Sequence, residues 1–412
     1  MKNLLFLVLI FLTFVKTLNA QWEQCNNDLG SPAIYSFIVD SNRTYTGTDN
    51  GVFMTTDNGD SWTTKNNGLK SSTVLVVESL TINGNNIYAG TWSDGIFLST
   101  DKGENWVRKS NGLPYIIDGY DTLFMVFINS ILINNNNIFI GTNNGIYLSN
   151  DNGTNWIARN NGLVQFDTLH RDVNSMVVNE NHIFAGTRYG VFMTSNNGDN
   201  WFPKNNGIDN LVVLSLVING KNIYAGTEYG GIFLSTDNGD DWKYIGRKNT
   251  IIAAIIINGN YIITSGPGVY LSTDNGNNWT EKNSGLENLG TKPIIINDDY
   301  IFAGTNEGGI FRAKLSDLGI TDVKENEQKN EGIIYPNPAS DVFRLKFSAP
   351  FAAIVQINIF DLLGNKVLSQ TEQCSEGTNE KQINCEMLPS GWYYVKININ
   401  GIIKTMPLVI VK

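Results

Sequence analysis

Histidine, cysteine and positive charge are scarce in this 412-residue sequence. The two histidines, His170 and His182, are too few for a histidine-rich metal centre. The three cysteines, Cys25, Cys374 and Cys385, cannot form a disulfide framework, although Cys374 and Cys385 are close enough in sequence to form one bridge in an oxidising compartment. Lys and Arg total 29 against 39 Asp and Glu, for a formal net charge of −10. This balance argues against nucleic acid as a partner, because phosphate binding needs a basic patch.

Long apolar runs are confined to the first twenty residues. Lys2 is followed by a nearly continuous apolar stretch, and Leu18-Asn19-Ala20 is typical of a cleavage site. We therefore predict a signal peptide over residues 1–20 that leaves Gln21 at the mature N-terminus. The alternative is an uncleaved N-terminal anchor. No later segment is long enough to span a bilayer, so we expect no transmembrane segment in the mature chain.

Glycine is plentiful, with 40 residues, and it separates short runs rich in Ile, Val, Tyr and Phe. This pattern predicts many short strands joined by tight turns. One motif, Ser/Thr-x-Asp-x-Gly-x-x-Trp, occurs six times, with successive tryptophans 37 to 50 residues apart. A period near 40 residues with several strands in each unit is typical of propeller blades. The Asp (Asn in the fourth copy), Gly and Trp positions of the six copies are Asp57, Gly59, Trp62; Asp101, Gly103, Trp106; Asp151, Gly153, Trp156; Asn196, Gly198, Trp201; Asp237, Gly239, Trp242; and Asp274, Gly276, Trp279.

A second motif, centred on Gly-Thr, precedes each copy and occurs seven times. The extra copy lies near Ala303-Gly304-Thr305, which has no following Ser/Thr-to-Trp motif. The segment Trp22–Leu29 aligns with Trp62–Leu69, the strand that follows the first motif copy. We therefore predict that the N-terminal strand returns to the last blade and closes a seven-bladed ring over residues 21–314, which protects the sheet edges.

The six-copy motif resembles the Asp-box, or BNR repeat, of sialidases, oligoxyloglucan hydrolases, sortilin-type receptors and photosystem II assembly factors. This resemblance implies a structural element and not a reaction. The Asp can accept backbone N–H groups across a turn, the Gly permits positive φ and the Trp can pack between blades. A calcium loop is the rival interpretation, but an EF-hand needs alternating ligands and a distal Glu that the motif lacks. We expect no metal and no cofactor.

Strand order places these motifs on one face of the disc and the loops between second and third strands, with the blade-to-blade loops, on the other. Aromatic and carboxylate side chains in those loops suit a sugar or peptide ligand in a shallow groove, although polar loop tips can also be simply solvated. The predicted ligand-binding residues are Trp92, Asp94, Tyr115, Asp118, Tyr120, Asp121, Asp167, His170, Arg171, Arg188, Tyr189, Glu228, Tyr229 and Glu307.

Two enzymatic functions are alternatives to ligand binding. A sialidase needs an arginine triad and an Arg followed by Ile-Pro near its start, and Phe311-Arg312-Ala313 lies at the wrong end and lacks the Pro. A glycoside hydrolase with paired carboxylates stays open, with Asp118, Asp121, Asp167, Asp172 and Glu228 as candidates. Since the resembling oligoxyloglucan hydrolases use two propellers to form their cleft, we favour a non-catalytic binding or adhesion module over a polysaccharide-acting hydrolase.

The repeat stops near residue 314. Residues 315–332 predict a charged, solvated linker. Residues 333–412 begin with Tyr335-Pro336-Asn337-Pro338, continue through Phe360–Gly364 and end on Lys412. This module resembles the type A C-terminal sorting domain of the type IX, or Por, secretion system. The alternative is a carbohydrate-binding or immunoglobulin-like module with no address function.

The resemblance implies Sec export to the periplasm, contact with the type IX machinery through the C-terminal domain, and a final location in the medium or on the outer-membrane surface. The propeller ligand is then expected to be a glycan or a protein. The predicted fold class is all-β, a seven-bladed β-propeller followed by a small immunoglobulin-like β-sandwich.

Overall fold

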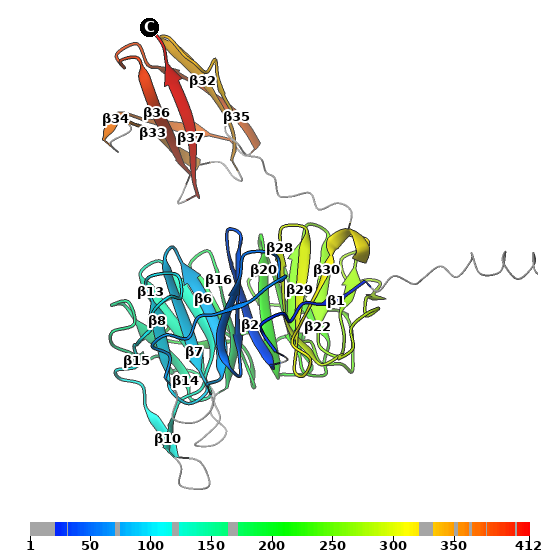
Figure 1. Ribbon diagram of the computed structural model, residues 1–412. Helices are drawn as coiled ribbons and strands as arrows, with labels where there is room; N and C mark the ends of the chain where they lie inside the picture. The colour runs from blue at the N-terminus through cyan, green and yellow to red at the C-terminus, as the bar shows by residue number, and fades with distance from the viewer. Residues whose placement is uncertain are drawn as a thin grey trace, which may run out of the picture. The chain divides into compact units, whose positions relative to one another are not determined.

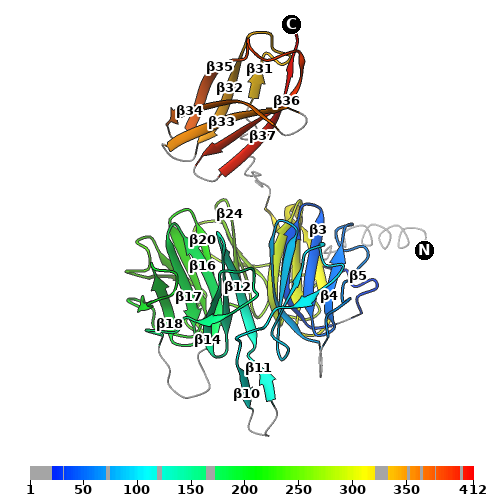
Figure 2. The same ribbon diagram turned by 90° about the vertical axis from the view of Figure 1, so that its left-hand side faces the viewer.

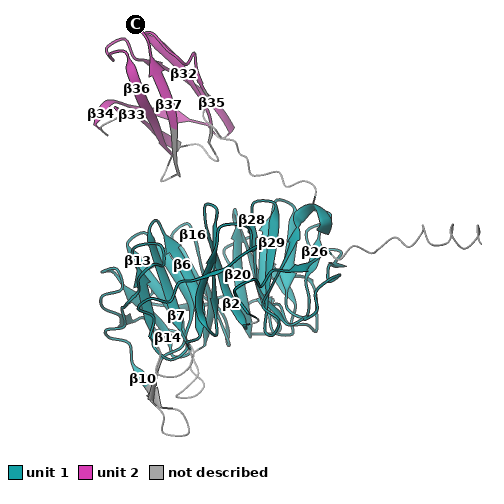
Figure 3. Cartoon of the chain, in the orientation of Figure 1, with its two compact units in different colours: residues 1–321 teal, residues 322–412 magenta. Residues whose placement is uncertain are grey.

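The computed structural model describes residues 21–30, 32–70, 75–117, 123–163, 172–320, 333–349, 353–361, 365–375, 377–399 and 402–412. The chain forms two compact units, residues 1–321 and 322–412 (Figure 3). In the described residues, the secondary structure of both units is β-strand apart from one short 3-10 helix, so the predicted all-β class is confirmed. No helix in the described ranges has the length and apolar character needed to cross a membrane.

Within the described residues, unit 1 contains seven four-stranded antiparallel sheets, numbered here 1 to 7 in chain order of their inner strands (Figure 1). Sheets 1 to 3 are β2 (Ile34–Asp40), β3 (Arg43–Thr48), β4 (Gly51–Thr55), β5 (Thr63–Thr64); β6 (Val77–Asn83), β7 (Asn86–Thr91), β8 (Ile96–Ser99), β9 (Val107–Arg108); and β12 (Ile128–Asn134), β13 (Asn137–Thr142), β14 (Gly145–Ser149), β15 (Ile157–Ala158). Sheets 4 to 6 are β16 (Val173–Asn179), β17 (His182–Thr187), β18 (Gly190–Thr194), β19 (Phe202–Pro203); β20 (Val213–Asn219), β21 (Asn222–Thr227), β22 (Ile232–Ser235), β23 (Lys243–Gly246); and β24 (Ala254–Asn258), β25 (Tyr261–Ser265), β26 (Tyr270–Ser272), β27 (Thr280–Glu281). Sheet 7 is β28 (Thr291–Asn297), β29 (Tyr300–Thr305), β30 (Ile310–Lys314) and β1 (Glu23–Gln24).

The sheets form a closed ring. Each inner strand contacts the inner strands of both neighbours, and β2 contacts β28 as well as β6. The apolar core lies between sheets and not within any one of them. Tyr45 and Val52 of sheet 1, for example, share a buried cluster with Ile87 and Phe97 of sheet 2. Since each sheet packs against a neighbour on both faces, its second strand is buried at nearly every position, as in β7. The inner strands also carry polar residues, as in β6.

The N-terminal segment supplies the outer strand of sheet 7. β1 pairs antiparallel with β30, with Glu23 opposite Arg312. The Trp22 indole is buried and donates to the Lys282 carbonyl at 2.6 Å, as the motif tryptophans do to the preceding sheets. This is where the alignment of Trp22–Leu29 with Trp62–Leu69 places the segment, and it covers a strand edge that would otherwise be open.

Unit 1 extends beyond the predicted boundary at residue 314. The helix η1 (Leu315–Leu318) follows β30 directly, and Leu315, Leu318 and Ile320 are all buried. The predicted linker therefore begins too early. Leu315, Leu318 and Ile320 alternate with polar residues, and the apolar side chains are buried against unit 1 instead of being exposed to solvent.

Each Ser/Thr-to-Trp motif, called a box below, forms the turn between the third and fourth strands. In sheet 3 the Asp151 carboxylate accepts the Ser149 hydroxyl at 2.8 Å and the Asn155 backbone N–H at 2.9 Å. The Trp156 indole is buried and donates to the Lys109 carbonyl of sheet 2 at 2.7 Å. The fourth box keeps the first two bonds through the Asn196 side-chain oxygen. The box therefore links its own turn to the neighbouring sheet.

Unit 2 contains a three-stranded and a four-stranded sheet, shown from a second side in Figure 2. The first is β31 (Ile333–Tyr335), β32 (Val342–Ala349) and β35 (Gly377–Asn384), and the second is β34 (Lys366–Cys374), β33 (Ala353–Asp361), β36 (Gly391–Ile399) and β37 (Ile402–Ile410). Residues of both sheets, such as Phe343 and Ile357, are buried in one shared core.

The disulfide that the sequence allows is absent. Cys374, at the end of β34, and Cys385, just after β35, are both buried in the core of unit 2, and they do not bridge each other. Cys25 is buried in unit 1, and burial raises its pKa to about 12. All three therefore act as small apolar core residues.

Candidate functional site

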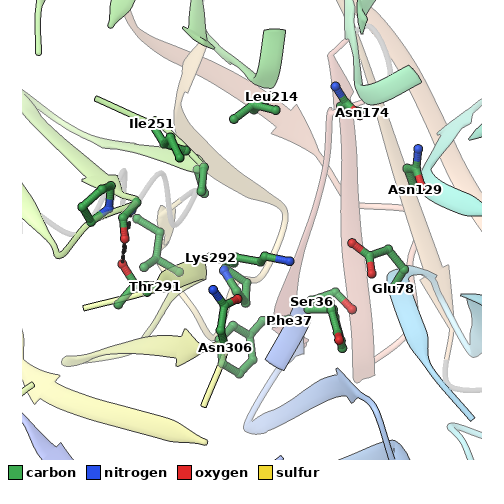
Figure 4. A pocket seen from close by; sticks show the side chains of 18 of the residues that line it. Ser36, Phe37, Glu78, Asn129, Asn174, Leu214, Ile251, Thr291, Lys292 and Asn306 are labelled. Atoms are coloured by element: carbon green, nitrogen blue, oxygen red, sulfur yellow. Dashed lines mark hydrogen bonds between the residues drawn. The ribbon is translucent and has the colours of Figure 1, made fainter. Parts of the chain in front are cut away.

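A cavity of about 890 Å³ opens at the centre of the ring, on the face where the inner strands begin. We call this the cavity face, and the opposite face, which carries the boxes, the box face. All seven sheets contribute lining residues, among them Glu78, Asn129, Asn174, Leu214, Ile251 and Lys292 (Figure 4). The volume lies within the range of small-molecule and peptide side-chain sites.

Seven of the residues that line the cavity come from one repeated backbone feature, a β-bulge near the start of the inner strand. In β2, Ile34 pairs with Thr48 and Ser36 with Gly47, so that Tyr35 is the extra residue. The same shift occurs in β6, β12, β16, β20 and β28. A bulge re-aims the side chain that it inserts. The bulge residues are Tyr35, Glu78, Asn129, Asn174, Leu214 and, in the longer bulge of β28, Lys292 and Pro293, and all of them line the cavity.

A glycine in the second strand makes room for this arrangement. A Cβ on Gly47 would lie 2.5 Å from both the Ser36 hydroxyl oxygen and the Val77 carbonyl oxygen of the next sheet. Gly90, Gly141 and Gly226 face the equivalent serines of sheets 2, 3 and 5 in the same way. The repeated Gly-Thr and the repeated Ser therefore build one framework, and the residue before each Ser differs in chemistry from sheet to sheet.

One wall of the cavity is aromatic and charged. The Trp92 ring stacks on Phe127 with centroids 6.0 Å apart and is tilted against Tyr35 at 6.1 Å. The Trp92 indole N–H donates to Glu78 Oε2 at 2.9 Å. Burial raises the pKa of Glu78, although Lys292 and the Trp92 hydrogen bond act to lower it. The wall thus holds a desolvated carboxylate beside exposed aromatic surface.

The opposite wall is apolar. It is formed by Leu214, Ile251, Ala253, Ala254 and Pro267 (Figure 4 labels Leu214 and Ile251). The strand β24 pairs with β25 without a register shift, so sheet 6 inserts no bulge residue. Because Ala253 and Ala254 stand where larger side chains enter from the other sheets, the cavity widens on this side.

The predicted loop residues occupy a second layer around the cavity. The first residue after the second strand donates its N–H to the carbonyl of the residue that precedes the inner strand of the same sheet, as Trp92 does to Val76, Arg188 to Asp172 and Glu228 to Val212. Trp92 reaches the cavity, whereas Arg188 and Glu228 do not line it. Arg188 instead pairs with Asp172 at 3.7 Å, and it is Asp172 that lines the cavity.

The other described candidates lie outside the cavity lining. Asp94 is buried in its own turn, where it accepts the Ser93 hydroxyl at 2.8 Å. Tyr189 packs against the core between sheets 3 and 4. Tyr229 and Glu307 are exposed on loop tips. Tyr115 is exposed on β10 (Tyr115–Ile117), which pairs with β11 (Leu123–Met125).

Six predicted residues lie outside the described part of the chain: Asp118, Tyr120, Asp121, Asp167, His170 and Arg171. Of the proposed hydrolase carboxylates, the structure therefore places Asp172 at the cavity and Glu228 away from it. Within the described ranges, no three His, Cys, Asp or Glu residues are grouped so as to hold a metal ion.

Sequence reasoning missed the bulge residues. A signal for them exists, because five inner strands begin with Ile or Val, one variable residue and Ser: Ile34-Tyr35-Ser36, Val77-Glu78-Ser79, Ile128-Asn129-Ser130, Val173-Asn174-Ser175 and Val213-Leu214-Ser215. The residue between the constant Ile or Val and the constant Ser is the one that differs from strand to strand.

Residues 333–412 match the family described as the secretion system C-terminal sorting domain. This confirms the resemblance of unit 2 and implies export by the type IX system, to the medium or to the cell surface. No curated protein matches the chain as a whole.

Several solved structures share the fold. YCF48 bound to D1 peptide has 17% identity and a TM-score of 0.54 over 75% of this chain and 98% of its own. An extracellular domain of BT4673 from B. thetaiotaomicron has 15% identity and a TM-score of 0.59 over 94% and 52%. An ancestral GH74 enzyme has 18% identity and a TM-score of 0.52 over 69% and 48%. At these identities the likeness shows a β-propeller fold and no shared activity.

Proposed function

We propose that the ring is a binding module that holds a glycan or a protein segment in its central cavity, and that unit 2 is the address that exports it. On this proposal the seven sheets are the seven blades of the propeller, unit 2 is an immunoglobulin-like sandwich, and the mature ring begins at Gln21. Attachment to the cell surface would follow when the sorting domain is removed or exchanged for an anchor.

The observation that carries the proposal is the chemical diversity of the bulge residues. Tyr35, Glu78, Asn129, Leu214 and Lys292 occupy equivalent backbone positions in different sheets, yet each offers a different kind of contact. A purely structural position in a repeat would hold similar residues, as the box does. Convergent polar groups in an otherwise apolar cavity are typical of ligand sites.

Two further observations agree with a binding role. The Trp92 side chain is 44% exposed although it lies at the cavity, and an exposed aromatic ring is suited to stack on a sugar or a peptide side chain. The YCF48 structure of the same fold holds a peptide. That likeness supports the use of a propeller for peptide binding and says nothing of the peptide itself.

The test is a screen of the purified protein on glycan and peptide arrays, repeated with Trp92→Ala and Tyr229→Ala. Tyr229 is an exposed aromatic of the same face outside the cavity lining, so its variant is the matched control. We expect at least one ligand whose binding is lost in Trp92→Ala and kept in Tyr229→Ala. Ligands that bind equally to all three proteins would contradict a site in the cavity.

A glycoside hydrolase is the second candidate. Glu78 and Asp172 both line the cavity, and burial raises the pKa of Glu78, as a general acid requires. Each array glycan that binds is therefore assayed for release of reducing sugar. Release that disappears in Glu78→Gln would establish the hydrolase, and binding without release would establish the module as non-catalytic.

A further inference from the structure

The cavity joins two dissimilar walls, and each wall constrains a ligand differently. On one side the Glu78 carboxylate points into the cavity beside aromatic rings, and on the other Ile251 and Leu214 present aliphatic surface (Figure 4). A ligand that fills both sides needs a polar end and an apolar stem. Sugars have hydroxyl groups along most of their surface and leave the apolar wall poorly matched.

The Glu78 side has room for a cation. Among the described residues, the Trp92 indole donates a hydrogen bond to the carboxylate, and Lys292 acts on it electrostatically without forming an ion pair. A desolvated carboxylate is stabilised by a cationic partner. The Trp92 ring contacts Tyr35 and Phe127, so the carboxylate lies at the edge of a cluster of three aromatic rings, which attract cations to their faces.

The chain already shows this preference with one of its own residues. The Lys292 ammonium lies over the Tyr35 ring, 5.0 Å from the centroid, and points across the cavity toward Glu78 without reaching it (Figure 4). Lys292 is exposed and carries the positive charge nearest to the site among the described lining residues. The Lys292 ammonium therefore stabilises the Glu78 carboxylate from a distance and competes with the cation of a ligand for it.

We infer that the ligand of the cavity is a protein segment that inserts a lysine side chain, with its ammonium on Glu78 beside Trp92 and Tyr35 and its aliphatic stem directed toward Leu214, Ile251 and Ala253. This inference deepens the proposed function and rests on it. It selects peptide over glycan, and it assigns the specificity to two bulge residues of opposite charge, Glu78 and Lys292.

The test uses small probes that separate charge from apolar stem: hexylammonium, hexanoate and hexanol, each titrated into the purified protein and followed by saturation-transfer NMR. We expect hexylammonium to bind with a Kd on the order of millimolar, as suits so few atoms, and the other two to bind about tenfold more weakly. Equal binding of all three probes, or tighter binding of hexanoate, would overturn the inference.

Two charge variants and one control identify the site. Glu78→Gln removes the charge with the shape kept and should weaken hexylammonium binding about tenfold, the effect of losing one charge-assisted contact. Lys292→Met removes the competing ammonium and should strengthen hexylammonium binding about two- to threefold, while hexanoate gains nothing. Glu228→Gln, on the same face outside the cavity lining, should leave both unchanged.

The arrays then separate this inference from the proposed function. Lysine-containing peptides that are lost in Trp92→Ala and in Glu78→Gln would support both. A neutral glycan that is lost in Trp92→Ala but binds Glu78→Gln and Lys292→Met as well as the unaltered protein would keep the cavity as a binding site and refute the lysine ligand.

Discussion

The two faces of the ring use the repetition of its sheets in opposite ways. On the box face, five boxes carry Asp and one carries Asn, and each makes the same hydrogen bonds within its turn. On the cavity face, the backbone repeats its bulge while the inserted side chain changes from Tyr to Glu, Asn, Leu or Lys. Side chains that bond their own backbone are held constant by the fold, whereas side chains that leave the backbone are free to differ.

The largest expected difference between the faces is in the cost of losing a tryptophan. Trp201 of the fourth box is 2% exposed and donates to the Arg159 carbonyl at 2.9 Å. Trp201→Ala should lower the free energy of unfolding by about 3–5 kcal/mol, because it leaves a cavity between sheets. Chemical denaturation of the purified protein measures this change.

Trp92→Ala is the matched variant on the cavity face. Trp92 is 44% exposed, and its removal should cost less than about 1 kcal/mol in stability while ligand binding is lost. If the two variants lost equal stability, Trp92 would be a structural residue and the contrast between the faces would fail.

The second largest expected effect on stability is at the glycines that pack against the bulged inner strands. A Cβ on Gly90 would clash with the Ser79 hydroxyl and would lie 2.5 Å from Ile128 Cγ2 of the next sheet. Gly90→Ala should therefore cost about 1–3 kcal/mol through overpacking. Its control is Gly391→Ala in unit 2, where the nearest atom to the new Cβ is 3.6 Å away. Thermal unfolding followed by near-ultraviolet circular dichroism compares the two, and an undisturbed Gly90→Ala ring would show that the bulge does not depend on close approach.

The sequence alone predicts the box face better than the cavity face. The boxes were predictable because Asp, Gly and Trp recur at fixed spacing, and the closing strand because Trp22–Leu29 repeats Trp62–Leu69. Glu78 and Lys292 were missed because a residue beside alternating apolar positions reads as an ordinary strand residue. Only the register, with Val77 and Ser79 opposite neighbouring residues of β7, shows that Glu78 is turned into the cavity.

The loop prediction includes Trp92, which lines the cavity, but it overlooked the layer of bulge residues beneath it. Arg188 and Glu228 occupy loop positions equivalent to Trp92, but their side chains do not line the cavity. The length and the rotamer of a loop side chain decide whether it lines the cavity, and the spacing of motifs in the sequence predicts neither. The boundary at residue 314 failed for a related reason, since the burial of Leu315 and Leu318 depends on the surface that they meet.

A smaller effect concerns pH and belongs to the box face. Hydrogen bonds from Asn155 and Ser149 lower the pKa of Asp151 to about 2, and bonds from Ser61 and Thr55 outweigh burial to lower that of Asp57 to about 2. A folded-state pKa below the ordinary value near 4 adds stability that is complete above that value and is lost as the pH falls toward 2. Urea denaturation should therefore show the unfolding free energy falling between about pH 4 and pH 2.

The fourth box supplies the control for this pH dependence. Asn196 makes the same two bonds without a titrating group. Asp151→Asn should copy that box and reduce the loss of stability between about pH 4 and pH 2, while Asn196→Asp should increase it. If neither variant changed the slope, the acid sensitivity would reside outside the boxes.

The smallest expected change in stability is at a bulge residue. Asn129 lines the cavity, so Asn129→Ser should alter the unfolding free energy by no more than about 0.5 kcal/mol. The neighbouring framework behaves differently, because the buried Ser79 hydroxyl donates to the Ile128 carbonyl at 2.8 Å and Ser79→Ala leaves that carbonyl short of a partner, at a cost of about 1–3 kcal/mol. Chemical denaturation of both variants, with ligand binding measured alongside, compares the stability cost of a bulge residue with that of a framework serine. A bulge residue that proved as costly as its framework serine would mean that the variable positions hold the ring together, and the diversity of Tyr35, Glu78 and Lys292 would then reflect packing and not recognition.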